Sequence, residues 1–555
     1  MRLKSGKYKR LEFFAKKNYS QSGNVILKKE ENILVKICVT DDVHHFYGVD
    51  LEEEKEYILL LENVDVPYAY LCGNDDLLEK GIGFLSINEE ENKFEVIDIG
   101  KFHDSLIKEQ YHFIPVKNWL NDPNGLCLYK NKYHMYYQAN PVMQKADFCY
   151  WGHTVSEDLI HWKYMPIAVF PQNELLENSE NRGGAFSGSA LVEGDILHIF
   201  FTRHLGRKNN LKDFCEYQVE AVSTDSIHFQ KEKIIIASKP EEEMTCDFRD
   251  PKVTFVNGKL WIVLAGGKNG HAILMGYSSE DMKSWKYEGI ILSDKRAVCY
   301  ECPDLFQLGE KMIAIGALMD YVDEDGHFRP TRYYLGQIKD GKFCIEAENN
   351  IDFGLNLYAT QSFQSKERRI LIGWIADFNN EHIFKENGCY GSMSIPRELS
   401  VKNQKLYMKP VQEIYTLLGE EVNVLIKDSC CAEVEGNSYY AVIKLKNESK
   451  LNILIAQNDK DELRLLWNNG IAEMVSTRDK GARYRTCLEK LDKIEIFFDR
   501  RVAEVFLNDG EAVGTRIFYT MQTTGRCSVQ VSRNEHVEEI KIFKMNSIWK
   551  GRKGL

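Results

Sequence analysis

Five strand-like runs of apolar residues recur in the middle of the chain, each preceded by a polar turn. The runs cover residues 133–138, 197–202, 260–265, 312–317 and 370–375, and they begin about 50 to 65 positions apart. Helical repeats would instead show apolar stripes with a 3.6-residue period, which this region lacks. Five β-units of this length predict an all-β fold with a five-bladed β-propeller, in which each blade is a small antiparallel sheet around a central channel.

A second sequence marker follows the first three runs. In each case a serine and an aspartate two positions later precede an aromatic residue four positions further on: Ser156, Asp158 and Trp162, then Ser223, Asp225 and Phe229, then Ser279, Asp281 and Trp285. Because the marker keeps its place after successive runs, it supports a repeated β-unit.

The regions on both sides of the propeller also have the pattern of short strands. We expect an N-terminal β-rich accessory domain over residues 1–104, in the form of a sandwich, and the propeller over residues 105–400. A linker with a short helix is expected over residues 401–420, and a C-terminal β-sandwich over residues 421–555, where short strands alternate with turns. The N-terminal domain is either a structural appendage packed on the propeller or a module that binds carbohydrate or forms oligomers.

Three carboxylic acids precede the apolar runs at nearly the same spacing. Counting back ten or eleven residues from each run leads to Asp122, Phe186-Ser187, Asp250, Glu301 and Ala359-Thr360. Equivalent positions of propeller blades point towards one axis, so the three acids should converge at the mouth of the channel. Taken alone, each acid could be a turn residue, since Asp-Pro-Asn-Gly is a typical turn sequence. Acids that repel one another yet are kept together indicate a functional site.

The segments around these acids resemble the signature blocks of glycoside hydrolase family 32. The blocks are Trp119-Leu-Asn-Asp122-Pro-Asn-Gly125, Phe186-Ser-Gly-Ser189, Arg249-Asp-Pro251 and Glu301-Cys-Pro-Asp304. The resemblance extends from about Gln110 to Glu398 and returns weakly near the C-terminus. The family includes invertases, levanases, inulinases and sucrose-6-phosphate hydrolases, and it combines a catalytic propeller with a supporting sandwich.

The resemblance implies a retaining β-fructofuranosidase that hydrolyses terminal non-reducing β-D-fructofuranosyl bonds. Its substrate would be sucrose, sucrose 6-phosphate or a short fructo-oligosaccharide. It assigns Asp122 as the nucleophile, Glu301 as the general acid/base and Asp250 as the transition-state stabiliser. Retention of configuration predicts that the carboxyl groups of Asp122 and Glu301 lie ~5–5.5 Å apart. A fructosyltransferase of the same family and a non-catalytic fructan-binding propeller are the alternatives.

Further side chains in these blocks are candidates to bind the sugar. The aromatic candidates for stacking are Trp119, Trp151 and Phe186, and the candidates for hydrogen bonding are Asn121, Gln138, Ser187 and Arg249. Tyr300 stands where many relatives have tryptophan, and we expect it to line the pocket and to affect substrate choice. A basic loop after the second run, with Arg203, His204, Arg207 and Lys208, is either a phosphate site or a solvated loop.

Composition argues against several other classes of partner, and the resemblance implies a small-molecule sugar as the substrate. The chain of 555 residues has a formal net charge of −12, and it lacks a basic cluster interleaved with aromatics, which argues against a nucleic-acid partner. No apolar run approaches the ~20 residues that cross a bilayer, and the charged start of the chain does not resemble a signal peptide. The 14 cysteines lack the spacing of a disulfide framework or a complete zinc site. We expect free thiols, a cytoplasmic location, no metal or cofactor, no membrane, and a homo-oligomer as one option.

Overall fold

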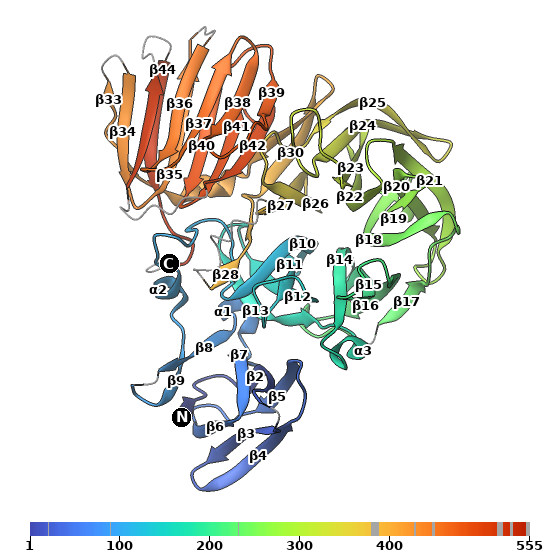
Figure 1. The fold of residues 1–555 in the computed structure, drawn as a ribbon, viewed down its shortest axis with the longest axis vertical. Helices are drawn as coiled ribbons and strands as arrows, with labels where there is room; N and C mark the ends of the chain where they lie inside the picture. Colours follow the sequence, from blue (N-terminus) through green and yellow to red (C-terminus); the bar gives the residue numbers. More distant parts are fainter. Residues whose placement is uncertain are drawn as a thin grey trace.

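The computed structural model describes residues 1–550 except residues 20, 89, 231, 379–387, 427–428, 447–449, 519–525 and 533–536. Figure 1 shows three all-β regions: an N-terminal domain, a ring of sheets and a sandwich. Among the described residues, no helix has the length and apolar character that a membrane crossing requires. The all-β prediction is confirmed.

The N-terminal domain is one curled sheet around its own apolar core. Its strands are β1 (Arg2–Lys4), β2 (Arg10–Lys17), β3 (Gly23–Lys29), β4 (Asn32–Val39), β5 (His45–Asp50), β6 (Glu56–Glu62), β7 (Val64–Cys72), β8 (Gly83–Asn88) and β9 (Lys93–Val96). Hydrogen bonds join all nine in the order β4-β3-β6-β1-β9-β8-β7-β2-β5. The predicted sandwich is therefore wrong in detail, because β8 pairs with both β7 and β9 and so links what would be two sheets.

The N-terminal domain packs on the outer strands of the first propeller blade. Phe14 contacts Tyr150 edge-on with ring centroids 5.5 Å apart, and Phe46 lies 4.6 Å from Phe170. The helix α1 (Leu77–Lys80), between β7 and β8, contacts the first blade, and the helix α2 (Ile99–His103) lies between β9 and the propeller. Such contacts are expected of a structural appendage packed on the propeller, which is one of the two alternatives for residues 1–104.

The described strands of the ring form five blades around a central axis (Figure 1). They are β10 (Asn118–Tyr129), β11 (Lys132–Asn140), β12 (Phe148–Ser156) and β13 (Trp162–Val169); β14 (Asn181–Glu193), β15 (Ile196–Arg207), β16 (Phe214–Ser223) and β17 (Lys233–Ile236); β18 (Met244–Val256), β19 (Lys259–Lys268), β20 (His271–Ser279) and β21 (Lys286–Asp294); β22 (Cys299–Leu308), β23 (Lys311–Met319), β24 (Thr331–Lys339) and β25 (Lys342–Asn350); and β26 (Leu357–Ser365), β27 (Arg368–Ile375), β30 (Arg397–Lys402) and β31 (Lys405–Pro410). The helix α3 (Asn173–Leu176) precedes β14. The predicted five-bladed propeller is confirmed.

Each predicted apolar run forms the second strand of a blade. The runs lie in β11, β15, β19, β23 and β27, which are buried between two neighbours of the same sheet. The ring closes where β28 (Cys389–Tyr390) pairs in parallel with β10, and β29 (Ser392–Met393) adds to β27. The first strand of each blade, which we call the inner strand, lines the axis.

The serine–aspartate marker forms the same turn in three blades, between the third and fourth strands. The Asp158 carboxylate accepts the N–H of His161 at 2.8 Å, as the Asp225 carboxylate does from His228 at 2.8 Å. In the third blade the Asp281 carboxylate accepts the N–H of Ser284 at 3.0 Å. The marker therefore identifies a repeated turn of the blades and not a catalytic site.

All five inner strands carry a β-bulge at the same level of the ring. Two inner-strand residues there face one residue of the second strand, at 121–122, 186–187, 250–251, 302–303 and 359–360. The first bulge residue is left-handed in three blades, with φ of 60° at Asp250 and 49° at Cys302 and Ala359. Bulges re-aim side chains next to active sites, and these bulges surround the mouth of the channel.

The bulges also correct the predicted register of the acids. Glu301 directly precedes its bulge, Asp250 is the first bulge residue of its strand, and Asp122 is the second. The three acids therefore occupy three successive positions of the repeat rather than one. Counting back from the runs could not detect this offset.

The C-terminal region is a sandwich of two antiparallel sheets. One sheet has the order β32 (Leu418–Glu421), β44 (Val537–Met545), β35 (Ser438–Leu445), β40 (Lys493–Asp499), β41 (Val502–Leu507) and β42 (Ala512–Ile517). The other has the order β33 (Leu425–Ile426), β34 (Ser429–Glu435), β43 (Arg526–Ser532), β36 (Lys450–Gln457), β37 (Glu462–Asn468), β38 (Ile471–Ser476) and β39 (Tyr484–Cys487). A 3₁₀ helix, η2 (Gln412–Leu417), connects it to the propeller.

A buried network of charged side chains joins the sandwich to the start of the propeller. His112 lies between two acids of the sandwich, with Nδ1 3.0 Å from Asp499 and Nε2 3.0 Å from Glu504. Arg397 donates to Glu504 at 2.5 Å and to Asp352 at 3.1 Å. Because burial makes an unpaired charge costly, this network fixes how the two domains dock.

We expect this network to make stability depend on pH above neutrality. Although burial opposes the shift, the hydrogen bonds and charges of Asp499 and Glu504 raise the pKa of His112 from 6.5 to about 9. A group whose pKa is raised on folding contributes stability that is fully present below its unfolded pKa. This contribution is lost as pH rises through its folded pKa. The free energy of unfolding should therefore fall between pH 6.5 and about 9, which urea denaturation at several pH values measures. A slope that persists unchanged in His112→Gln would contradict the assignment to His112.

Candidate active site

A cavity of about 250 Å³ lies where the five bulges meet, at the mouth of the channel. Residues from the inner strands of all five blades line it, together with residues of neighbouring strands and of three connections. The predicted residues among them are Trp119, Asn121, Asp122, Gln138, Phe186, Ser187, Arg249, Asp250 and Glu301. The structure thus brings the three acids together in one cavity, although they are far apart in the sequence.

Asp122 lies on β10 and receives hydrogen bonds from three other side chains. Ser187 donates to its Oδ2 at 2.5 Å, and Asn121 donates to its Oδ1 at 3.0 Å. The Cys302 thiol donates to Oδ2 at 3.3 Å. Burial raises the pKa of Asp122 and the charge of Glu301 adds to the increase, while the bonds from Ser187 and Asn121 oppose it. These donors hold the carboxylate in a fixed orientation.

Asp250 is held by one side-chain group and one backbone group of the neighbouring blades. Its N–H donates to Thr202 Oγ1 at 2.9 Å, and its Oδ2 accepts the N–H of Cys302 at 2.8 Å. Burial raises the pKa of Asp250 to about 8, although the guanidinium of Arg249 opposes the increase. The Asp250 carboxyl therefore stays protonated to a higher pH than an isolated aspartate side chain would.

Glu301 is held by cations and a phenol from three other segments. Arg249 donates to its Oε1 at 3.0 Å, and Tyr358 donates to its Oε2 at 2.6 Å. Arg329 stands 3.8 Å from the same Oε2. Unlike Asp122, this acid is contacted by two guanidinium groups, so the two acids have different electrostatic surroundings.

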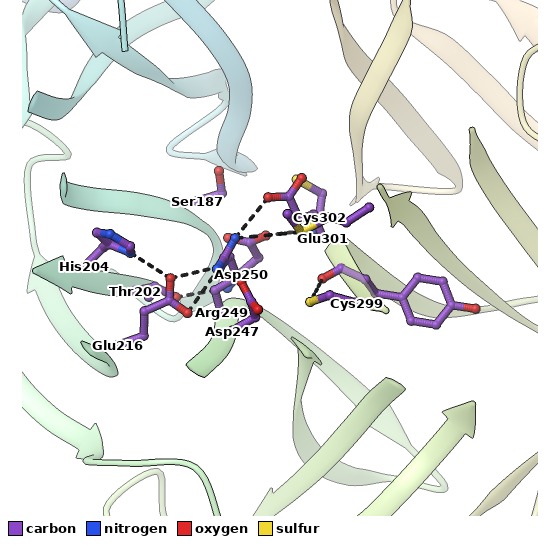
Figure 2. A network of polar contacts seen from close by, with 12 residues as sticks. Ser187, Thr202, His204, Glu216, Asp247, Arg249, Asp250, Cys299, Glu301 and Cys302 are labelled. Atoms are coloured by element: carbon purple, nitrogen blue, oxygen red, sulfur yellow. Dashed lines mark hydrogen bonds and ion pairs between the residues drawn. The ribbon is translucent and has the colours of Figure 1, made fainter. Parts of the chain in front are cut away.

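A chain of polar contacts connects Glu301 to the second blade (Figure 2). Arg249 binds Glu301 with one nitrogen and Glu216 with another, the latter at 2.9 Å. Glu216 in turn lies 2.8 Å from His204 Nδ1, and the His204 ring stacks on Phe186 at 4.2 Å. The chain fixes Arg249 and Phe186, which face the cavity.

The other cavity residues form an aromatic and amide wall. Trp119 donates from Nε1 to the Asn121 side chain at 2.6 Å and stacks on Tyr390 at 4.2 Å. Gln138 donates to the Ala185 carbonyl at 2.9 Å, and its Oε1 has no hydrogen-bond partner among the described residues. A free amide acceptor and a flat indole are suited to a hydroxyl-rich ring.

Tyr300 and Trp151 do not line the cavity, which corrects their predicted role. Consecutive strand residues point to opposite faces, so Tyr300 points away from the cavity when Glu301 points into it. The Tyr300 hydroxyl lies 2.6 Å from that of Tyr334, inside the blade. Trp151 is fully buried on β12 and donates to the Phe186 carbonyl at 3.0 Å, so it supports the wall from behind.

The basic loop is largely engaged elsewhere. Arg203 binds Glu232 and the Phe170 carbonyl, and His204 binds Glu216. Lys208 stands 3.5 Å from Asp147, which lines the cavity. Neither alternative, a phosphate site or a solvated loop, holds for Arg203 and His204, which are buried on β15.

Several cavity residues were not predicted from the sequence. They are Ala146, Asp147, Cys149, Arg182, Gly183, Cys302, Arg329, Tyr358, Trp374 and Phe378. Tyr358 precedes the bulge of the fifth blade at the register of Glu301, so the repeat itself is a signal for it. Arg329 lies in a connection outside the strands, where the repeat gives no signal.

The arrangement provides the groups that glycoside hydrolysis requires. Two carboxyl groups in different surroundings, one of them beside two arginines, can divide the duties of nucleophile and proton donor. A third buried acid and an amide can bind sugar hydroxyls around a positively charged transition state.

Residues 112–410 match the family description "Glycosyl hydrolases family 32 N-terminal domain", and residues 412–546 match "Glycosyl hydrolases family 32 C terminal". The chain belongs to glycoside hydrolase family 32. The predicted family and the predicted enzyme class, a glycoside hydrolase, are confirmed. A sucrose-6-phosphate hydrolase of Zymomonas mobilis is 31% identical over 446 residues, which cover 73% of this chain and 84% of that protein. A sucrose-6-phosphate hydrolase of Escherichia coli is 29% identical over 484 residues, covering 81% of this chain and 97% of that protein.

A solved family 32 structure matches nearly the whole glycoside hydrolase. It is described as glycoside hydrolase family 32 from Bifidobacterium adolescentis and has a TM-score of 0.92 at 28% identity. The match covers 99% of this chain and 100% of that chain. It therefore includes the N-terminal domain, which lies outside both family descriptions.

Proposed function

We propose that this glycoside hydrolase is a β-fructofuranosidase that releases fructose from the non-reducing end of a small fructoside with retention of configuration. The observation that carries the proposal is the meeting of Asp122, Asp250 and Glu301 in one cavity, each held by donors from neighbouring blades. The curated relatives named as sucrose-6-phosphate hydrolases support a fructoside of the size of sucrose.

Asp122 attacks the anomeric carbon of fructose and forms a covalent glycosyl-enzyme. The bonds from Ser187 and Asn121 hold its carboxylate in position for this attack. Glu301 protonates the leaving oxygen and then deprotonates the water that releases fructose. Asp250 accepts hydrogen bonds from the sugar hydroxyls and stabilises the oxocarbenium-like transition state.

The substrate is sucrose, sucrose 6-phosphate or a short fructo-oligosaccharide, and the enzyme acts in the cytoplasm. Every cysteine that the structure describes is a free thiol, which is typical of a reducing compartment. A fructosyltransferase of the same family is the alternative within the enzyme class. Retention of all three acids argues against a propeller that only binds fructan.

Fructose release from sucrose, sucrose 6-phosphate, kestose, inulin and levan, measured in parallel with the purified enzyme, tests this function. We expect hydrolysis of the small substrates to exceed that of the two polymers, because the relatives named as sucrose-6-phosphate hydrolases point to a substrate of the size of sucrose. Preference between sucrose and its 6-phosphate then identifies the leaving group. Absence of fructose release from all five would refute the proposal, and transfer products without free fructose would favour the fructosyltransferase.

A further inference from the structure

The loop of residues 320–330, which joins β23 to β24, extends from the active-site cavity to the sandwich domain. Its C-terminal end carries Arg329, which lines the cavity. Its tip carries Asp325, which binds Arg485 on β39 of the sandwich. One short connection therefore contacts both the catalytic acid Glu301 and the second domain.

The tip of the loop is fixed to the sandwich by several different contacts. Arg485 binds the Asp325 carboxylate with two nitrogens, at 2.8 Å and 2.6 Å. The N–H of Arg483 donates to the Asp325 carbonyl at 2.7 Å, and His327 Nε2 lies 2.9 Å from the Arg483 carbonyl. Between them, Gly326 has a φ of +88°, and a Cβ there would stand 3.0 Å from Ala482. The backbone of the loop thus touches the sandwich directly.

The loop is internally braced, so the position of its tip determines the position of its end. The Asp323 carboxylate accepts the N–H of Asp325 at 3.0 Å and that of His327 at 2.9 Å. Val322 and Phe328 form an isolated β-bridge, and the N–H of Arg329 donates to the carbonyl of Tyr321 at 2.8 Å. A braced hairpin transmits displacement instead of absorbing it.

The cavity end of the loop reaches Glu301 by two routes. Arg329 has a left-handed φ of 54° and places its guanidinium 3.8 Å from Glu301. Phe328 packs edge-on against Phe378 at 5.6 Å, and Phe378 packs against Tyr358 at 5.1 Å. Tyr358 is the residue whose hydroxyl donates to Glu301. A non-glycine residue in a left-handed conformation is kept there only where its surroundings enforce it.

We propose that Asp325 is a positioning residue for the reaction, because its contact with the sandwich holds Arg329 and Phe328 in the geometry that orients Glu301. This inference rests on the proposed function, in which Glu301 is the acid/base. The sandwich then contributes to catalysis through its edge strand β39, beyond the supporting role that the family resemblance implies. Without the contact, the tip of the loop would keep only its backbone and His327 contacts with the sandwich, and a surface loop held by fewer contacts moves more readily.

Asp325→Ala, Arg485→Ala and the double variant test this role. We expect each single variant to lower kcat for fructose release about tenfold with KM within about twofold, since small displacements of catalytic groups cost rate rather than binding. The double variant should lose no more than either single variant, because both remove one contact. An ion pair at the surface with 31% and 26% of its two side chains exposed contributes little to stability, so the midpoint of thermal unfolding should stay close to the wild-type value.

Two further variants separate positioning from general damage to the sandwich. Glu462→Ala removes an acid that binds Arg464 with the same two-nitrogen geometry on β37, where neither residue touches the loop, and it should leave kcat unchanged. Arg329→Ala should lower kcat at least as far as Asp325→Ala, and adding Asp325→Ala to it should lower kcat little further.

Wild-type kcat in both Asp325→Ala and Arg485→Ala, with an active parent enzyme, would overturn this inference alone. An equal loss in Glu462→Ala, or a loss in Asp325→Ala that adds in full to that of Arg329→Ala, would also overturn it. A parent enzyme that releases no fructose would instead refute the proposed function, and the inference with it.

Discussion

Replacing Asp122 by asparagine is expected to lower kcat for fructose release by roughly 10³-fold or more, because an amide cannot form the glycosyl-enzyme bond. The variant should fold normally, since asparagine keeps the size of the side chain and can accept from Ser187 at the same position. Steady-state fructose release and thermal unfolding of the same preparation measure the two expectations.

Glu301→Gln provides the comparison that separates the two roles. It should slow sucrose hydrolysis strongly. For a fructoside with an acidic leaving group, kcat/KM, which reports formation of the glycosyl-enzyme, should fall much less, because that step then needs no proton donor. Asp122→Asn should be slow on both substrates. Asp225→Asn, in a blade turn outside the cavity, is the matched control and should be fully active. Wild-type turnover by either cavity variant would refute the assigned roles.

Replacing Glu504 by glutamine is expected to lower the free energy of unfolding by about 3 to 5 kcal/mol, because it leaves buried cations without their partner. Glu504 is fully buried; its Oε2 accepts from Arg397, and its Oε1 accepts the N–H of Ile395 and lies 3.0 Å from His112 Nε2. Guanidinium denaturation measured at neutral pH gives the change.

The control for this effect is an exposed acid of the same domain. Glu420 stands 3.2 Å from Lys544 with 77% of its side chain exposed, so Glu420→Gln should change stability by less than about 1 kcal/mol. Equal destabilisation by the two variants would mean that the buried network does not fix the docking of the domains. Stability unchanged in Glu504→Gln would mean the same.

Much of the propeller could be predicted because its signal is local and repeated. The apolar runs mark the buried second strands, and the position of Asp122, Asp250 and Glu301 ahead of them follows from the blade unit. The family resemblance then gives these acids their expected roles. In the first four blades adjacent strands are consecutive in sequence, so strand order there needs no further information.

The remaining features depend on contacts between distant segments. Tyr300 was expected to line the pocket from its place beside Glu301, but strand alternation turns it into the blade. Arg329 enters the cavity from a connection whose path is set by the sandwich. The pairing of His112 with Asp499 and Glu504 joins residues nearly 400 positions apart, which no local pattern encodes.

The aligned bulges restrict how this sequence can change during evolution. Removing or adding one residue within an inner strand would shift every side chain beyond that point to the opposite face and move an acid out of the cavity. Insertions and deletions should therefore be excluded from the five inner strands and accumulate in the connections between strands and ahead of the propeller. The N-terminal domain, which precedes the first inner strand and packs on the outside of its blade, is an addition of the tolerated kind.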